Sequence, residues 1–189
     1  MNAMTQIAPA MTNGVPVDDV KALIAAVTAD PAAGKTRWRV ANTWRGRFQS
    51  RAHVDGFEIG GQAVPRPFDM DVDEPAELGG TNRHANPQEY LLAALNACMT
   101  VGFTALCALN GYEIESLEIA TEGDIDLRAF LCIDLDATPG YERLETTVTV
   151  KGSATPEQFQ EIFDLVLKSS PNFHNITRPV AVTPRLVVR

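Results

Sequence analysis

The sequence predicts an α+β fold in which antiparallel sheets wrap around one central buried helix. Residues 36–72 alternate apolar and polar side chains with a period of two, which is typical of strands. Segment 88–111 is instead apolar around nearly its whole circumference, which indicates a buried helix. More strands and an amphipathic helix follow without a linker or an internal repeat. We therefore expect residues 1–34 to form a tail with a short helix, and residues 35–189 to form a single domain.

The N-terminal region predicts one short helix after a frayed end. Residues 1–14 include Pro9, Gly14 and several small polar residues, and we expect them to be frayed. Asp18 and Asp19 offer N-caps for a helix of residues 18–29. Its apolar positions recur at helical spacing: Val20, Leu23, Ile24 and Val27.

The first sheet is predicted to have about three antiparallel strands. Trp38 and Val40 alternate with arginines, and a second apolar alternation reaches Val54. Asp55-Gly56 then has the composition of a hairpin turn, which predicts a return strand at Phe57–Val64. A further extended piece is expected at Pro67–Val72.

The central helix has clear predicted ends. Asn86-Pro87 opens it, and Gly111 is a good residue to follow its last turn. Two apolar stripes run side by side along it: Leu91, Leu95, Cys98, Gly102, Leu106 and Leu109 in one, and Leu92, Met99 and Phe103 in the other. Because alanines fill most of the remaining face, we expect burial on all sides, by a sheet or by a second copy of the helix.

Three more strands and a closing strand are predicted in the second half of the chain. The three are Glu115–Glu122, Leu127–Leu135 and Arg143–Lys151, with Pro139-Gly140 as the turn between the last two. The closing strand is expected at Pro179–Val188.

A second helix is predicted before that closing strand. Thr155 is an N-cap, Pro156 suits the first helical position, and Gln158 completes a capping box. Pro171 ends the helix at Ser169-Ser170. Its apolar stripe comprises Phe159, Ile162, Phe163, Val166 and Leu167.

Composition excludes several functional classes. The formal net charge of −8 argues against nucleic-acid binding, which needs a concentrated basic face. No uninterrupted apolar run approaches the roughly 18 residues of a membrane span, and the N-terminus lacks the pattern of a secretory signal. We therefore expect no membrane association.

Cysteine and histidine usage indicates a reducing compartment without a metal site. The three cysteines (Cys98, Cys107 and Cys132) are an odd, low number and include no CxxC pair, which predicts a cytoplasmic protein without a disulfide framework. The histidines are too scattered to form a metal-binding pattern: His53, His84 and His174. We expect neither a metal ion nor another cofactor.

Several separated motifs occur in an order that resembles a known family. The stretch from Asp73, DEP…LGGTNRHANPQEYLLAALNACMTVGFTALCALNGYEI, is similar to the signature of the OsmC/Ohr family. The later segments EGDIDLRAF, PGYERLETTVTV and SSPNFHNITRPVAV resemble its later strands and second helix. The resemblance covers roughly residues 37–188.

The resemblance implies an intertwined homodimer with the long helix at its centre. It also implies peroxidase chemistry on organic hydroperoxides or peroxide, with Cys98 as the thiolate that attacks the O–O bond. An arginine beside the sulfur would favour the thiolate and stabilise the leaving alkoxide. Glu89 matches the family's glutamate, which orients that arginine, and Arg45 and Arg47 are the candidate arginines.

One position departs from the family pattern. Peroxidatic members carry a second cysteine just before a proline, where this chain has Ser170 and Pro171. Three interpretations stay open: a one-cysteine enzyme with an external thiol reductant, Cys132 or Cys107 as a substitute, or no peroxidase activity at all. In the last case the protein would be a non-catalytic dimer that binds a small apolar ligand.

Each candidate residue also has a purely structural interpretation. A lone cysteine on an apolar helix such as Cys98 is often a packing residue. Glu89 places a carboxylate in the first turn, where the helix dipole favours it. It is also nine residues from Cys98, or about 180° of helical rotation, so the two side chains would face opposite sides. Arg45 and Arg47 are also explained as strand-surface charges.

Overall fold

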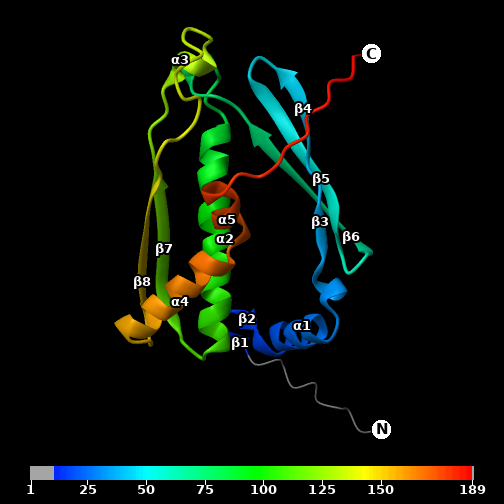
Figure 1. The fold of residues 1–189 in the computed structure, drawn as a ribbon, viewed down its shortest axis with the longest axis vertical. Helices are drawn as coiled ribbons and strands as arrows, with labels where there is room; N and C mark the ends of the chain where they lie inside the picture. Colours follow the sequence, from blue (N-terminus) through cyan, green and yellow to red (C-terminus); the bar gives the residue numbers. More distant parts are fainter. Residues whose placement is uncertain (1–10, 189) are drawn as a thin grey trace. The chain divides into compact units, whose positions relative to one another are not determined.

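The computed structural model describes residues 11–188 and groups them in two compact units, the first ending at Leu91 and the second beginning at Leu92. Helix α2, Pro87–Leu109, crosses this boundary. Strands and helices are mixed throughout the described chain, so the predicted α+β class is confirmed (Figure 1). The predicted division after residue 34 stays a prediction.

The first unit begins with a small hairpin that was not expected. Strands β1, Met11–Thr12, and β2, Val15–Pro16, pair around a turn in which Asn13 and Gly14 have φ of 54° and 74°. The prediction of a frayed end is therefore wrong for residues 11–14. Its remaining part, residues 1–10, lies outside the described residues.

Helix α1, Val17–Ala29, and a 3₁₀ turn η1, Pro31–Gly34, follow. Asp18 and Asp19 lie in the first turn of α1 and do not cap it, because strand β2 leads directly into the helix and puts Pro16 at the cap position. Their carboxylates still stand where the helix dipole favours negative charge.

The sheet of the first unit is built around β5, Gln49–Ile59. Strand β6, Gln62–Val72, pairs with β5 from Ile59↔Gln62 to Ser50↔Val72. Two shorter strands, β3 at Thr36–Trp38 and β4 at Ala41–Gly46, pair with successive parts of β5. The sheet thus has four strands in place of about three, because residues 36–46 contain two short strands, while the pieces expected at Phe57–Val64 and Pro67–Val72 fall within β5 and β6.

The predicted hairpin turn at Asp55-Gly56 is wrong. These residues lie inside β5, at a register shift between Val54 and Gly56. A Cβ on Gly56 would lie 2.3 Å from the backbone oxygen of Val64. The absence of a side chain therefore allows β5 and β6 to approach closely at this bulge. The true turn is Gly60-Gly61, where both residues have positive φ of 55° and 77°.

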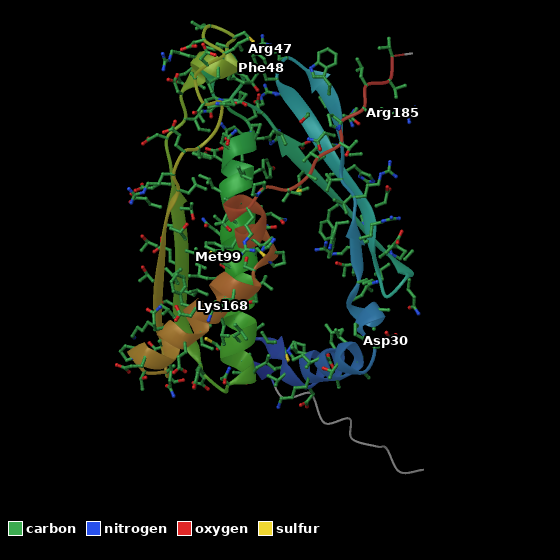
Figure 2. The ribbon with its side chains drawn as sticks, viewed as in Figure 1. Asp30, Arg47, Phe48, Met99, Lys168 and Arg185 are labelled. Carbon is green, nitrogen blue, oxygen red and sulfur yellow. The ribbon has the colours of Figure 1, made fainter. Side chains whose placement is uncertain are left out.

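Helix α2 has the predicted ends. It starts at Pro87, and Gly111 beyond its C-terminus has a φ of 73°. Its buried positions include Leu95 and Met99, the latter labelled on the helix in Figure 2. Val101, however, is 70% exposed, so the expected burial on all sides is not met within one chain.

The second unit packs α2 against a hairpin and a crossing helix. Strands β7, Ile114–Glu122, and β8, Glu145–Gly152, pair antiparallel. Helix α4, Pro156–Ser169, runs obliquely across α2 (Figure 1), and a short helix α5, Pro171–Thr177, follows it. The fully buried centre contains side chains from α2 and α4: Leu95, Met99, Phe103, Cys107, Ile162 and Val166.

Two predicted strands are absent from the described residues. Segment 127–135 instead contains the short helix α3, Leu127–Phe130, because the Asp126 carboxylate accepts the backbone N–H of Arg128 at 2.9 Å and caps it. The C-terminal segment 179–188 forms no regular element in the described chain. Pro179 and Pro184 supply no N–H to a ladder, which weakens pairing of this segment.

By length and composition alone, α2 could cross a membrane, although Asn96, Thr100 and Thr104 interrupt its apolar side chains. The core helices of soluble proteins pass the same test. In this chain α2 packs its buried face on α4 and the β7–β8 hairpin.

Candidate functional site

Cys98 lies on α2 in the second unit, where its side chain is only partly exposed. The hydroxyl of Ser170 donates a hydrogen bond to the Cys98 Sγ at 3.3 Å. Ser170 is itself buried, with 5% of its surface exposed. The residue at the place of the family's second cysteine therefore does contact the candidate nucleophile, through oxygen in place of sulfur.

The junction between α4 and α5 holds Ser170 in this position. The backbone N–H of Ser170 donates to Val166 O at 2.8 Å, which closes the last turn of α4. Its Oγ accepts the backbone N–H of Phe173 at 3.3 Å and so caps α5. Pro171 supplies the first helical position of α5, because its missing N–H needs no partner there. The predicted helix end before Pro171 is confirmed.

Two further contacts fix α4 and α5 against α2. The Asn172 side-chain amide donates to the backbone oxygen of Ala94 at 2.8 Å. One helical turn from the Cys98–Ser170 pair, Gly102 faces Val166: a Cβ on Gly102 would lie 3.6 Å from a Val166 methyl. Val166 lies one turn before Ser170 on α4, so the packing of α4 on α2 at Gly102 lies beside the hydrogen bond between the sulfur and the hydroxyl.

On the hairpin side, a polar network ties α2 to β7 and β8. The Thr121 hydroxyl donates to Asn96 Oδ1 at 2.6 Å and lies 2.9 Å from the Thr146 hydroxyl. Thr100 Oγ1 donates back to the Asn96 carbonyl at 2.9 Å. Satisfied polar groups on an otherwise apolar helix specify its register, so this network helps to set the position of Cys98, two residues further along.

The other two cysteines of the second unit differ in exposure: Cys107 is buried and Cys132 is exposed. Cys107 is fully buried, and burial raises the pKa of its thiol to about 11, which makes it a poor nucleophile or resolving thiol. Cys132 is exposed in a loop with a φ of 56°. The strand predicted at Leu127–Leu135, which would have contained Cys132, does not form.

The candidate arginines lie in the first unit. Arg45 is on β4, and Arg47 has a φ of 47° in the turn before β5, where its carbonyl accepts the Trp44 indole N–H at 2.8 Å. Figure 2 labels Arg47 beside Phe48 at that turn. Arg45 lines a cavity of about 300 Å³ together with Gln49, Ser50, Arg51, Asp71, Val72 and His84.

An ion pair between Arg51 and Asp71 lies at the wall of the cavity beside Arg45. Arg51 binds Asp71 through two hydrogen bonds of 2.6 and 2.8 Å. The hydrogen bond from Arg51 holds the pKa of the Asp71 carboxyl below its usual value, with smaller contributions from the charges of His84 and Arg45. Arg51 is therefore already paired, which leaves Arg45 as the more available guanidinium of this cavity.

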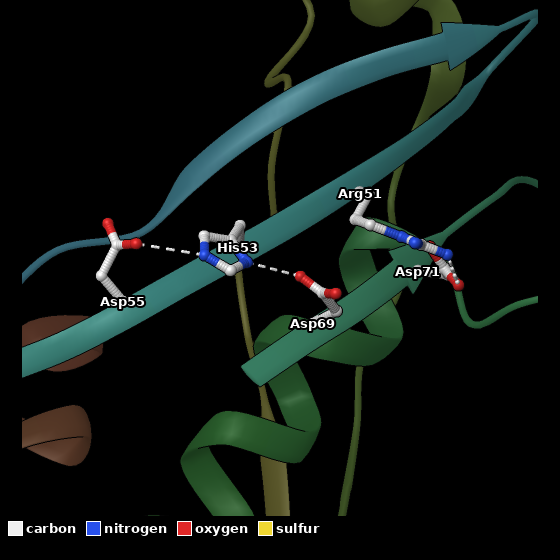
Figure 3. A network of polar contacts seen from close by, with 5 residues as sticks. All are labelled: Arg51, His53, Asp55, Asp69 and Asp71. Atoms are coloured by element: carbon white, nitrogen blue, oxygen red, sulfur yellow. Dashed lines mark hydrogen bonds and ion pairs between the residues drawn. The ribbon is translucent and has the colours of Figure 1, made fainter. Parts of the chain in front are cut away.

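Next to that ion pair, His53 lies between two carboxylates on the same sheet (Figure 3). Its ring nitrogens are 2.6 Å from Asp69 and 3.1 Å from Asp55. The hydrogen bond with Asp69 raises the His53 pKa most, and Asp55 adds to this. Among the described residues, no group of three or more histidine, cysteine, aspartate or glutamate side chains is arranged so that it could hold a metal ion.

Glu89 closes a capping box at the start of α2. Its carboxylate accepts the backbone N–H of Asn86 at 2.7 Å, and its own N–H donates to Asn86 Oδ1 at 2.8 Å. Glu89 thus has a structural role in the first turn of α2, as its purely structural interpretation suggested. Because α2 is continuous from Pro87 to Leu109, the half-turn separation from Cys98 also holds.

Asp73, which the sequence patterns did not single out, organises the loop before α2. This carboxylate is fully buried and accepts the Thr81 hydroxyl at 2.5 Å and the backbone N–H of Arg83 at 3.1 Å. The Thr81 hydrogen bond holds the pKa of Asp73 well below its usual value. Gly80 closes the loop so tightly that a Cβ there would lie 1.8 Å from Glu74 O. The Asp-Glu-Pro and Gly-Gly motifs were the available signal.

Comparison with known proteins agrees with these motifs. The family model described as OsmC-like protein matches residues 80–185, more than half of the chain. The chain belongs to the OsmC-like family. The matched region contains Cys98, Ser170 and most of the second unit.

Solved OsmC-like structures share the fold of this member at low sequence identity. An OsmC-like protein from Mycoplasma pneumoniae has a TM-score of 0.59 and 15% identity, covering 75% of this chain and 87% of that one. An OsmC-like protein of unknown function from Vibrio cholerae has a TM-score of 0.52 and 15% identity, covering 72% and 91%. No curated protein sequence matches the chain significantly.

Proposed function

We propose that this OsmC-like protein is a thiol-dependent peroxidase that reduces organic hydroperoxides or peroxide through Cys98. The observation that most supports this proposal is that Cys98 is partly exposed and that the Ser170 hydroxyl donates to its sulfur at 3.3 Å. A donor to sulfur stabilises the thiolate, which is the form that attacks peroxides. Family membership supports the same chemistry.

The reaction balances with one protein cysteine and an external thiol. The Cys98 thiolate attacks one peroxide oxygen, the O–O bond breaks, and the leaving alkoxide takes a proton to give an alcohol and a sulfenic acid. A first external thiol attacks the sulfenic sulfur and releases water, and a second releases the mixed disulfide and restores the thiolate. A reducing cytoplasm would supply such thiols, and we place the protein there.

Peroxide consumption tests this proposal. Purified protein is mixed with cumene hydroperoxide and dithiothreitol, and peroxide loss is followed for the native chain and for Cys98→Ser. We expect turnover in the native chain and none in the variant. Cys132→Ser removes the other exposed thiol and should keep full activity. Equal peroxide loss in native protein and Cys98→Ser, or none in either, contradicts the proposal.

We further propose that Arg45 or Arg47 supports Cys98 in the assembled protein, oriented by Glu89. A guanidinium would stabilise both the thiolate and the leaving alkoxide, worth about 10²-fold or more in rate. Separate alanine substitutions of Arg45 and Arg47 should show which one acts, with Arg39→Ala, in the link between β3 and β4, as a control. If neither substitution slows peroxide consumption more than Arg39→Ala does, the arginine role is refuted.

The protein is also proposed to be a homodimer. Val101 in the middle of α2 is 70% exposed in one chain, on a helix with few polar positions. A second copy would cover that apolar surface. Sedimentation should show a dimer at low micromolar concentration, and Val101→Glu should shift it towards monomer. A native monomer under these conditions contradicts this part of the proposal.

A second candidate function is non-catalytic binding of a small apolar ligand. It is supported by a groove of about 780 Å³ between β8 and α4, to which three aromatic side chains contribute: Phe103, Phe159 and Phe163. Under this alternative an apolar fluorescent probe binds, Phe159→Asp abolishes binding, and peroxide leaves Cys98 unoxidised. Oxidation of Cys98 by stoichiometric hydroperoxide favours the peroxidase.

A further inference from the structure

The Ser170 hydroxyl is held in one orientation by two different partners. Its oxygen accepts the backbone N–H of Phe173 at 3.3 Å, and its single proton is directed to the Cys98 Sγ, also at 3.3 Å. Because 95% of its surface is covered, water competes little for either interaction. A hydroxyl has one proton to donate, so the capping interaction and the sulfur interaction are complementary and do not exclude each other.

Capping alone does not require this arrangement. Serine, threonine, asparagine, aspartate and glycine all serve at helix N-caps, and none of them needs a sulfur neighbour. The neighbouring Ser169 provides a contrast: its hydroxyl is exposed and donates to Leu165 O at 2.8 Å within its own helix. Of these two adjacent serines, only Ser170 contacts the candidate nucleophile.

We propose that Ser170 is a positioning residue for Cys98, whose hydroxyl stabilises the reactive thiolate and keeps the sulfur directed at the α4–α5 junction. The hydrogen bond is stronger to a charged sulfur than to a neutral thiol, so it favours the thiolate. A second cysteine at this position would form a disulfide with the oxidised Cys98. Because Ser170 cannot do so, the Cys98 sulfenic acid is reduced by an external thiol. Only this last statement rests on the proposed peroxidase function.

Alkylation of Cys98 tests the positioning role without peroxide. In a Cys132→Ser background, the rate of iodoacetamide addition to Cys98 is measured at neutral pH by intact mass. Ser170→Gly keeps most of the cap but loses the hydroxyl, and it should react roughly tenfold more slowly, the size expected for a lost hydrogen bond to a charged group. Ser170→Thr keeps the hydroxyl and should react at nearly the native rate. Ser169→Ala is the matched control.

Measurements at high pH separate ionisation from access to the sulfur. Above roughly pH 10 an ordinary thiol is ionised in any case. The Ser170→Gly defect should therefore disappear there. A defect that persists at high pH, or an unchanged rate for Ser170→Gly at neutral pH, overturns the proposal.

Ser170→Cys tests where the oxidised sulfur is directed. After one equivalent of cumene hydroperoxide, the native chain should gain one oxygen atom at Cys98, trapped as a dimedone adduct. Ser170→Cys should instead lose two hydrogen atoms by forming a Cys98 disulfide with the new thiol. A trapped sulfenic acid without disulfide in Ser170→Cys contradicts the geometry. If no variant consumes peroxide while the alkylation pattern holds, the peroxidase function fails and the positioning role stands.

Discussion

Gly102→Ala tests the close approach of α2 and α4 that brings Ser170 to Cys98. Gly102 lies one helical turn after Cys98, and it faces Val166, which lies one turn before Ser170. An added Cβ would meet two Val166 methyl carbons at 3.6 and 3.8 Å, which is ordinary van der Waals contact. The methyl group therefore fits without displacing α4.

The sign and size of the effect follow from this space. Alanine is favoured over glycine within a helix by about 0.5–1 kcal/mol, because the unfolded chain loses less backbone entropy. Since no clash opposes this gain, Gly102→Ala should raise the free energy of unfolding by about that amount. With a urea dependence of about 2 kcal/mol per molar, the midpoint should rise by roughly 0.4 M.

Urea unfolding followed by far-ultraviolet circular dichroism measures the change. Gly111→Ala is the matched control at the end of the same helix, where the space is open but φ is 73°. That control should lose about 1–2 kcal/mol, because an L-residue is strained in the left-handed region. Destabilisation by Gly102→Ala would show that α2 and α4 pack more closely than described, and would refute the reasoning.

Three other predictions follow from single contacts. Thr155→Ala removes the hydroxyl of the α4 capping box and should lower the free energy of unfolding by about 1 kcal/mol in urea denaturation; an unchanged midpoint contradicts this. Asp69→Asn should lower the His53 pKa in an NMR titration. Because folding raises that pKa, the contribution of His53 to stability is present below about pH 6.5 and is lost as pH rises through the folded value; an unchanged titration refutes the assignment. Native protein at pH 8 should be alkylated at Cys132 and not at Cys107, whose thiol pKa burial raises to about 11; rapid labelling of Cys107 would show that its surroundings open.

Local signals were sufficient where they act within a few residues. The capping box of Thr155 and Gln158 and the helix end before Pro171 depend on neighbouring backbone groups, and both are confirmed. Gly111 ends α2 for the same kind of reason. The bulge at Gly56 depends on a partner strand, so the sequence alone suggested a turn there. The Asp126 cap of α3 is an exception, because it acts two residues away and was still missed when residues 127–135 were predicted to form a strand.

The candidate site was only partly predictable. Family motifs identified Cys98 and the departure at Ser170, but not the 3.3 Å hydrogen bond between them, because it joins residues 72 positions apart. The burial of Asp73 was also missed, since its donors lie 8 to 10 residues further along the loop. The roles of Arg45, Arg47 and Glu89 towards Cys98 stay predictions.

Single-turnover oxidation is the most direct test of the proposed chemistry. Reduced protein receives one equivalent of cumene hydroperoxide with dimedone present, and the adduct is located by peptide mass spectrometry. We expect one adduct per chain, at Cys98, formed as the peroxide disappears and absent from Cys98→Ser. Peroxide that persists beside unmodified Cys98, or equal peroxide loss in Cys98→Ser, would contradict it.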